Sequence, residues 1–287
     1  MAARGVDAPS FNEHPTGGEV DLVQLDRDHP GFRDPEYRAR RNAIAQLALD
    51  YRLGQPIPEV DYTDVEHGVW RVALETLAPL HARYACAQFL ECWPALGFDP
   101  GRIPRFADVN RVLGASTGFS LVPVAGLVSA PVFMTYLASG VFLATQYIRH
   151  HSRPLYTPEP DVIHELVGHA ALLASPELAA TNRRFGLATQ RADEATVEAL
   201  IRVYWYGLEF GVARRGDGLA VLGAGLLSSF GEIGRLGSEA QLLPFDIPTM
   251  AATPFDPTDY QRVLFVGPST EEMLGPLDEW LDRIIRG

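Results

Sequence analysis

The longest uncharged stretch of the chain, residues 112–148, limits the folds that this sequence can adopt. A helix of about 20 apolar residues crosses a bilayer, so residues 121–147 have the length of a membrane span. Pro123 and Pro131 interrupt this run, and polar residues lie in its second half. The sequence holds no second run of this kind. We therefore expect an apolar loop and then a buried core helix from Pro131 to Ile148, without a membrane partner.

The composition indicates one ordinary globular domain. Of the 287 residues, 47% are hydrophobic and 21% are charged. All 24 basic residues are arginine, which excludes enzymes that need a lysine amine or a P-loop lysine. A net charge of −12 argues against a nucleic-acid partner, because a phosphate backbone requires a basic face. Cys86 and Cys92 suggest no disulfide framework, and no secretory signal is apparent, so we expect a cytoplasmic protein.

Apolar periodicity and helix caps predict a mainly α-helical fold with minor β-structure. The expected helices cover about 35–53, 63–92 with an interruption at Pro79, a segment capped by Thr157, about 193–209, and a C-terminal stretch around 273–284. The turn at residues 215–218 predicts a short hairpin between Val212 and Val221. We expect a flexible lead-in at residues 1–19 and a single domain over residues 20–287.

The residues with the clearest chemical potential lie in the segment 156–169, which reads YTPEPDVIHELVGH. His164 and His169 are five residues apart in an apolar helix, unlike the i, i+4 pair of the zinc motif H-E-x-x-H. Five residues of α-helix turn by about 140°, so the two rings could share an ion only from adjacent faces. Two buried core histidines are the alternative, but the neighbouring carboxylate of Glu165 favours a metal site.

A third ligand is expected on the helix that begins near Asp193. Glu209 falls on the apolar face of this helix, where a carboxylate must be paired, protonated or bound to a metal. Arg202 or Arg214 could supply a pairing charge. Two histidines and one carboxylate would instead form a facial triad with open positions, which suits non-haem Fe(II) and oxygen chemistry.

These segments resemble the pterin-dependent aromatic amino acid hydroxylases. Besides YTPEPDVIHELVGH, the matching strings in order include DHPGFRDPEYRARR, YRLGQPIPEVDYT, TGFSLVPVAGL, TQYIRH, YWYGLEFG, GAGLLSSFGE and LLPF. The resemblance covers roughly residues 20–270. It implies a single helix-rich catalytic domain with iron in a central pocket. It also implies that the ring of an aromatic amino acid is hydroxylated with O2, Fe2+ and a tetrahydropterin.

The resemblance implies roles for individual residues. His164, His169 and Glu209 match the iron ligands of the family, in agreement with the triad inferred above. The residues matched to the amino-acid site are Arg149, which would clamp the carboxylate, Thr157 and Ser228 at the head group, and Trp205 and Phe210 around the ring. The residues matched to the pterin site are Leu127, Val128, Phe133 and Glu165.

Two departures from the family pattern bear on the substrate. Leu143 replaces a polar residue of many members, and Pro257 stands where tyrosine hydroxylases have Asp. We therefore expect phenylalanine 4-hydroxylation to tyrosine, with phenylalanine 3-hydroxylation or tryptophan hydroxylation as alternatives. Outside the family, a zinc hydrolase with Glu165 as base and a non-catalytic amino-acid sensor stay open. The expected partners are the amino acid and the pterin, bound by a monomer or weak dimer.

Overall fold

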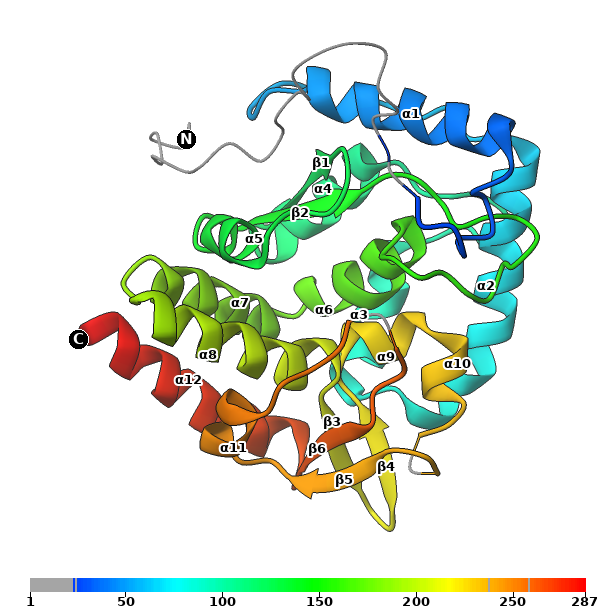
Figure 1. The fold of residues 1–287 in the computed structure, drawn as a ribbon. Coiled ribbons are helices and arrows are strands. Elements are labelled where there is room, and N and C mark those ends of the chain that lie inside the picture. The colour runs from blue at the N-terminus through cyan, green and yellow to red at the C-terminus, as the bar shows by residue number, and fades with distance from the viewer. Residues whose placement is uncertain (1–22, 24, 237, 258) are drawn as a thin grey trace.

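The structure is a computed structural model that describes residue 23 and residues 25–236, 238–257 and 259–287 (Figure 1). Helices dominate these residues and strands are few, so the predicted mainly α fold is confirmed. The expected lead-in at residues 1–19 lies outside the described residues. No helix of the described ranges is long and apolar enough to cross a membrane.

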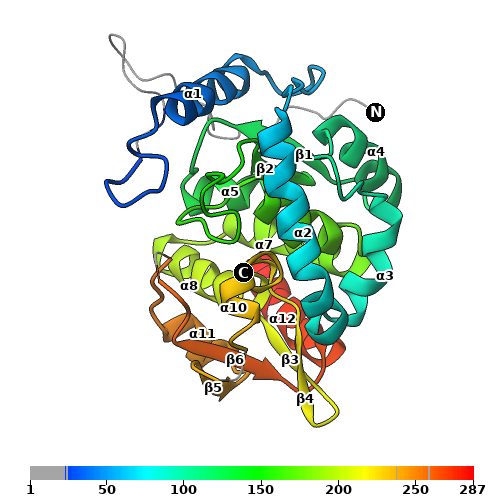
Figure 2. The same ribbon diagram turned by 90° about the vertical axis from the view of Figure 1, so that its right-hand side faces the viewer.

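The first part of the chain forms four helices, which are α1 (Pro35–Asp50), α2 (Asp64–Tyr84), α3 (Ala87–Leu96) and α4 (Phe106–Ser116). Thr63 and Glu66 form the capping box that starts α2. Pro79 does not interrupt this helix, contrary to our expectation. The break comes at Cys86, whose N–H donates to the carbonyl of Val221 at 2.9 Å. Figure 2 shows α2 running along one side of the molecule.

The uncharged stretch forms a β-α-β unit. It consists of β1 (Ser120–Val124), α5 (Ala130–Leu137) and β2 (Val141–Thr145), and the two strands pair in parallel. The predicted core helix to Ile148 is therefore wrong beyond residue 137. Gly140 adopts φ +72°, a left-handed conformation that favours glycine and ends the helix. All residues of β2 are buried, which explains the absence of charge.

The middle of the chain holds two π-helical segments. The elements are η1 (His164–Ala170), α6 (Ala171–Leu173), α7 (Pro176–Thr189), α8 (Glu194–Tyr204) and η2 (Trp205–Glu209). The expected helix cap at Thr157 is wrong, because Thr157 lies in an irregular segment and donates its hydroxyl to the carbonyl of Glu159. The helix starts only after Asp161, whose carbonyl accepts the N–H of Glu165.

The last part of the chain adds the larger sheet and its helices. These are β3 (Val212–Arg215), β4 (Gly218–Val221), α9 (Ala224–Ser228), α10 (Phe230–Ile233), β5 (Gln241–Pro244), α11 (Ile247–Ala252), β6 (Val263–Gly267) and α12 (Thr270–Arg286). The strand order is β4-β3-β6-β5. β3 and β4 form the predicted antiparallel hairpin. The predicted C-terminal amphipathic helix is also confirmed, since Met273, Leu277 and Leu281 of α12 are buried.

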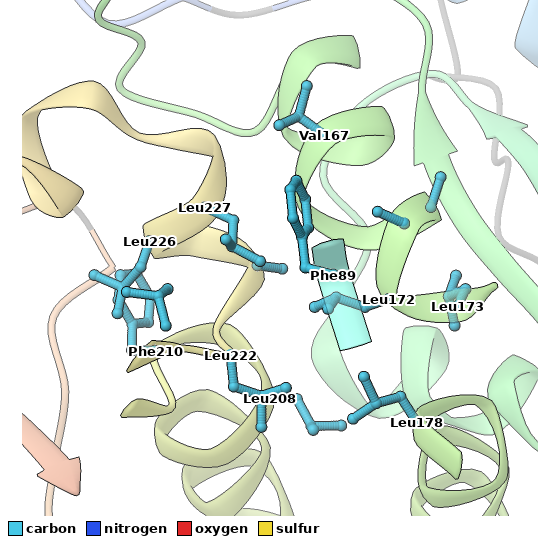
Figure 3. Packing of buried hydrophobic residues seen from close by; sticks show 14 of the residues in the cluster. Phe89, Val167, Leu172, Leu173, Leu178, Leu208, Phe210, Leu222, Leu226 and Leu227 are labelled. Atoms are coloured by element: carbon cyan, nitrogen blue, oxygen red, sulfur yellow. The ribbon is translucent and has the colours of Figure 1, made fainter. Parts of the chain in front are cut away.

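The core lies between η1, η2, α9 and the surrounding helices. Figure 3 shows Phe210 beside Leu226 of α9, and Leu208 next to Leu222, in the same buried cluster as Val167 of η1. Gly168 of η1 allows a close approach to α9, because a Cβ at this position would lie 2.7 Å from the carbonyl oxygen of Ala224. The two segments that carry the candidate ligands, η1 and η2, thus both pack on α9.

Candidate metal centre and active site

Three side chains from the two π-helical segments converge in the interior. The Nε2 atoms of His164 and His169 are 3.0 Å apart. Glu209 places Oε1 at 3.0 Å from His169 Nε2 and Oε2 at 3.8 Å from His164 Nε2. A separation of 3.0 Å suits neighbouring ligand atoms that each lie about 2.1 Å from one ion. The two nitrogens and the carboxylate therefore fit a single metal ion.

The π-helical turns explain why residues five apart meet. In an α-helix His164 and His169 would diverge, but a π-helix bonds residue i to i+5 and places such residues on one face. The same geometry ends the second segment, where the N–H of Phe210 donates to the carbonyl of Trp205 at 2.8 Å. Our sequence-based expectation of rings approaching from adjacent faces assumed an α-helix and was wrong in this respect.

Ser228 fixes the tautomer of the first histidine. Its hydroxyl donates to the carbonyl of Ala224 at 2.8 Å, so Oγ accepts from His164 Nδ1, which lies 2.9 Å away. With its hydrogen on Nδ1, His164 presents the lone pair of Nε2 to the centre. The structure thus places Ser228 behind a candidate ligand; its expected contact with the amino-acid head group stays a prediction.

The electrostatics of the three side chains suit metal binding. Burial, reinforced by the nearby His169, lowers the pKa of His164 to about 4. Burial opposes ionisation of Glu209, but His169 outweighs it through charge and a hydrogen bond, so the pKa of Glu209 falls. Burial likewise opposes protonation of His169, and the Glu209 carboxylate reverses the balance and raises its pKa. The pocket thus favours neutral His164 and ionised Glu209, the forms that bind cations, whereas His169 would release its proton to the solvent when it binds a metal.

A second carboxylate, that of Glu165, lies beside the same centre. Glu165, His164 and His169 each offer one ligand atom, and these three atoms lie within 4.8 Å of one another. Its Oε1 already accepts hydrogen bonds from the backbone N–H and the hydroxyl of Thr145, at 3.1 and 2.9 Å. Burial raises the pKa of Glu165 to about 7. Because Glu209 is ionised and contacts His169 directly, Glu209 is the better third ligand.

A buried ion pair adjoins the first histidine. Arg149 donates from Nε and Nη2 to the two oxygens of Asp161, both at 2.8 Å, and its backbone N–H donates to Oδ2. Asp161 Oδ1 also accepts the backbone N–H of His164 at 3.2 Å. Burial opposes ionisation of Asp161, but Arg149 holds its pKa below the usual value. One carboxylate thereby fixes the guanidinium and the start of η1 together.

An aromatic wall stands next to the centre. The Trp205 ring stacks on Phe255 with centroids 4.2 Å apart and contacts Phe210 at 4.7 Å. Its Nε1–H donates to Gln261 Oε1 at 2.8 Å. Trp205 begins η2, so the same short segment carries the wall and the ligand Glu209.

The chain was compared with known proteins. The family model for the biopterin-dependent aromatic amino acid hydroxylases matches residues 19–287. The chain belongs to this family. Rat phenylalanine-4-hydroxylase is 44% identical to this chain over 252 residues, which cover 86% of the chain and 56% of the rat protein. Mouse tyrosine 3-monooxygenase is 43% identical over 267 residues, which cover 91% of the chain and 54% of the mouse protein.

Solved structures agree with this membership. The structure of Chromobacterium violaceum phenylalanine hydroxylase with bound Fe(III) matches with a TM-score of 0.76 at 29% identity, covering 87% of this chain and 91% of that one. The structure of the same enzyme with iron (III) and oxidised 7,8-dihydrobiopterin matches with a TM-score of 0.74 at 30% identity, covering 85% and 92%. The chain spans about half the length of the curated relatives named above.

The residues expected to bind pterin lie around the β-α-β unit of the chain. Leu127 is 72% exposed and Val128 is half-buried, both between β1 and α5. Phe133 of α5 contacts Phe142 edge-on at 5.0 Å, and Phe142 contacts the His169 ring at 4.4 Å. These aromatic contacts connect the expected pterin residues with the metal centre.

Four residues that the structure places at the site were not predicted from the sequence, and one of them is Phe255, which stacks on Trp205. Asp161, Thr145 and Gln261 hold Arg149, Glu165 and Trp205, respectively. Asp161 had a local signal, because an Asp before an apolar helical run is a typical helix N-cap. Thr145 and Gln261 had none, since their partners lie 20 and 56 residues away.

Proposed function

We propose that this protein hydroxylates the aromatic ring of L-phenylalanine at the 4-position, using O2 and a tetrahydropterin at Fe(II). The observation that carries the proposal is the convergence of His164, His169 and Glu209 in a buried pocket beside Arg149 and an aromatic wall. Family membership and the iron- and pterin-bound structure of the bacterial relative support it.

The proposed metal ligands are His164, His169 and Glu209. Two neutral imidazoles and one carboxylate leave Fe(II) with a net charge of +1 and with free coordination positions. When bound, Fe(II) and the tetrahydropterin would together activate O2 and supply the oxygen atom added to the ring. The chain itself would hold the ligands, orient the substrate and keep water away from the reacting atoms.

Arg149 would bind the carboxylate of the amino acid. Asp161 occupies Nε and Nη2 along one edge of the guanidinium, which leaves the Nη1 edge for the substrate. Because Asp161 also holds the start of η1, the carboxylate end of the substrate and the ligand His164 keep a fixed relation. Thr157 and Ser228 would contribute at the head group, as the resemblance implies.

The aromatic wall favours phenylalanine over tyrosine. Trp205, Phe210 and Phe255 offer no acceptor for a phenol hydroxyl, and the Trp205 Nε1–H is already donated to Gln261. Burying an unpaired hydroxyl is costly, so an apolar wall selects an apolar ring. The identities to phenylalanine and tyrosine hydroxylases are similar, so the support for phenylalanine comes from the chemistry of the wall.

The tetrahydropterin would lie against Phe133, with Leu127 and Val128 beside it and Glu165 at its polar edge. A pterin ring stacked on Phe133 would be linked to the metal centre through Phe142, which contacts both Phe133 and the His169 ring. The neutral carboxyl that burial favours at Glu165 can donate a hydrogen bond as well as accept one. The proposed assembly is a monomer or weak dimer.

The test is an incubation of the iron-loaded protein with tetrahydropterin, O2 and each of Phe, Tyr and Trp, followed by chromatographic identification of the product. We expect tyrosine from phenylalanine, dependent on iron and pterin. 3-Hydroxyphenylalanine or hydroxytryptophan as the main product would reassign the substrate or ring position. Pterin-independent activity with stoichiometric zinc would replace the proposal with a hydrolase, and amino-acid binding without O2 consumption would indicate a sensor.

A further inference from the structure

The side chain of Gln261 is fully engaged at the edge of the aromatic wall. It is 9% exposed, and its Oε1 accepts the Trp205 Nε1–H at 2.8 Å. Its Nε2 donates to the carbonyls of Asp256 and Asp259, at 3.0 and 3.1 Å. Indole nitrogen only donates and carbonyl oxygen only accepts, so these partners settle which way the amide points.

The backbone of Gln261 is held as well. Its N–H donates to Oε1 of Glu232 at 3.1 Å. Glu232 lies in α10, directly after the α9 segment that carries Ser228. Gln261 is therefore tied on one side to Trp205 and on the other to the helices behind the metal centre.

The amide also shapes the connection between α11 and β6, which carries Phe255. By bonding the carbonyls of Asp256 and Asp259, Gln261 folds this connection back on itself directly after Phe255. Phe255 stacks on Trp205 with an interplanar angle of 11°. One side chain thus holds both members of the stacked pair, Trp205 directly and Phe255 through its own segment.

Only an amide can make these three bonds. Glutamate has the acceptor but lacks the two donors, arginine has donors but no acceptor, and methionine has the length but neither. Without Gln261, the half-buried indole N–H and two carbonyls would lose their partners, and Trp205 and Phe255 could move relative to each other.

We propose that Gln261 is a positioning residue that determines which ring carbon of the bound amino acid faces the metal centre. It acts through Trp205 and Phe255, and the proposal rests on the function proposed above. Trp205 begins the segment that ends at Glu209, so the orientation of the indole relative to the ligands sets the depth and tilt of the substrate ring.

The test compares Gln261→Met with Gln88→Met in the iron-loaded enzyme. Gln88 is a matched control, because it is 8% exposed and hydrogen-bonded to Glu271, away from the site. We expect Gln261→Met to raise the KM for phenylalanine about tenfold, as loss of a hydrogen bond of ordinary strength would. Product hydroxylated at a second ring carbon should also increase, while iron content and the KM for tetrahydropterin stay at wild-type values.

Two further variants test whether Gln261 acts on the substrate through Trp205 and Phe255. In a Trp205→Phe background, Gln261→Met should raise the KM by clearly less than tenfold, since the bond to the indole is already gone and only the hold on the Phe255 segment remains to be lost. Gln261→Glu keeps the acceptor for the indole and should give a product ratio closer to wild type than Gln261→Met. This second variant also tests the proposal if Gln261→Met fails to retain iron.

Calorimetric titration of phenylalanine into the iron-loaded protein distinguishes a failure of the proposed role of Gln261 from a failure of the proposed function. If wild type binds and hydroxylates phenylalanine while Gln261→Met matches Gln88→Met in affinity and product ratio, the role of Gln261 is overturned and the proposed function stands. A full additional effect of Gln261→Met in the Trp205→Phe background would also overturn it. If wild type neither binds nor hydroxylates phenylalanine, both proposals fail.

Discussion

The metal centre and the aromatic wall lie side by side but are built in different ways. The centre takes its side chains from two π-helical segments packed on α9, and each is held by short local or buried contacts. The wall depends on the connection between α11 and β6, which Gln261 ties to Trp205 across 56 residues. The centre therefore follows from regular backbone geometry, whereas the wall depends on one long-range contact. Changes in the centre should abolish activity, and changes in the wall should redirect it.

The largest effect is expected from removing the carboxylate of the centre. Glu209→Ala leaves two neutral imidazoles without the anion that contacts both. Iron content, measured by atomic absorption, and turnover should fall together by more than about 100-fold, the upper range for loss of an outer partner of a ligand. Unchanged turnover with full iron would remove Glu209 from the site and make Glu165 the candidate ligand.

Arg149→Lys tests the residue that is proposed to bind the substrate carboxylate. Lysine lacks the planar fork that meets Asp161 on one edge and, as proposed, the substrate carboxylate on the other. The KM for phenylalanine should rise about 10- to 100-fold, as for loss of a charge-assisted bidentate contact. The KM for tetrahydropterin should stay within about twofold. Arg183→Lys, at a guanidinium bonded to the carbonyl of Thr117, is the matched control. Equal increases in the KM for phenylalanine and the KM for tetrahydropterin would count against a carboxylate-binding role for Arg149.

Ser228→Ala tests whether iron binding depends on the hydrogen bond between Ser228 and His164. The change removes the acceptor for His164 Nδ1–H, so the ring loses its fixed tautomer and orientation. Iron affinity, measured by competition with a chelator, should fall about 10- to 100-fold while the fold is kept. Ser116→Ala is a control because its hydroxyl also bonds a carbonyl four residues earlier, on the exposed face of α4. If the two variants keep the same iron affinity, the hydrogen bond to His164 does not support the metal.

The smallest effect concerns Glu232 behind the wall. Burial raises its pKa from 4.5 to about 7, so the folded state loses stability as pH rises through this range. Glu232→Gln keeps an acceptor for the Gln261 N–H and removes the titration. Its melting temperature relative to wild type should therefore be higher at pH 8 than at pH 5, by about 2 to 4 °C. Glu198→Gln, on the exposed face of α8, should show no such trend. A difference independent of pH would contradict the buried ionisation.

The sequence predicted the composition of the centre better than its geometry. His164, His169 and Glu209 could be selected because polar groups on apolar helical faces need partners, and the structure brings them together. The π-helical turns that do so could not be predicted from the α-helical period of the side chains. The predicted core helix up to Ile148 failed for a related reason. A fully buried strand and a buried helix both appear as continuous apolar runs, so periodicity does not separate them.

The wall was predicted only in part. Trp205 and Phe210 came from the family resemblance, but Phe255 and Gln261 were not recognised. Their roles arise from a stacking contact and a hydrogen bond between segments far apart in the chain. The helices with clear caps, such as those starting at Pro35 and Asp64, were predicted because capping is local. Local signals therefore gave the helices and the ligands, and long-range contacts determined the remainder.

The most direct test of the proposed metal centre is anomalous diffraction at the iron edge from crystals of the iron-loaded protein. We expect one peak that His164 Nε2, His169 Nε2 and the carboxylate of Glu209 all coordinate. Asp34, His150 and His151 form a second group whose ligand atoms lie within 4.8 Å of one another, nearer the surface. A main peak at that group, or one coordinated by Glu165 in place of Glu209, would contradict the proposed centre.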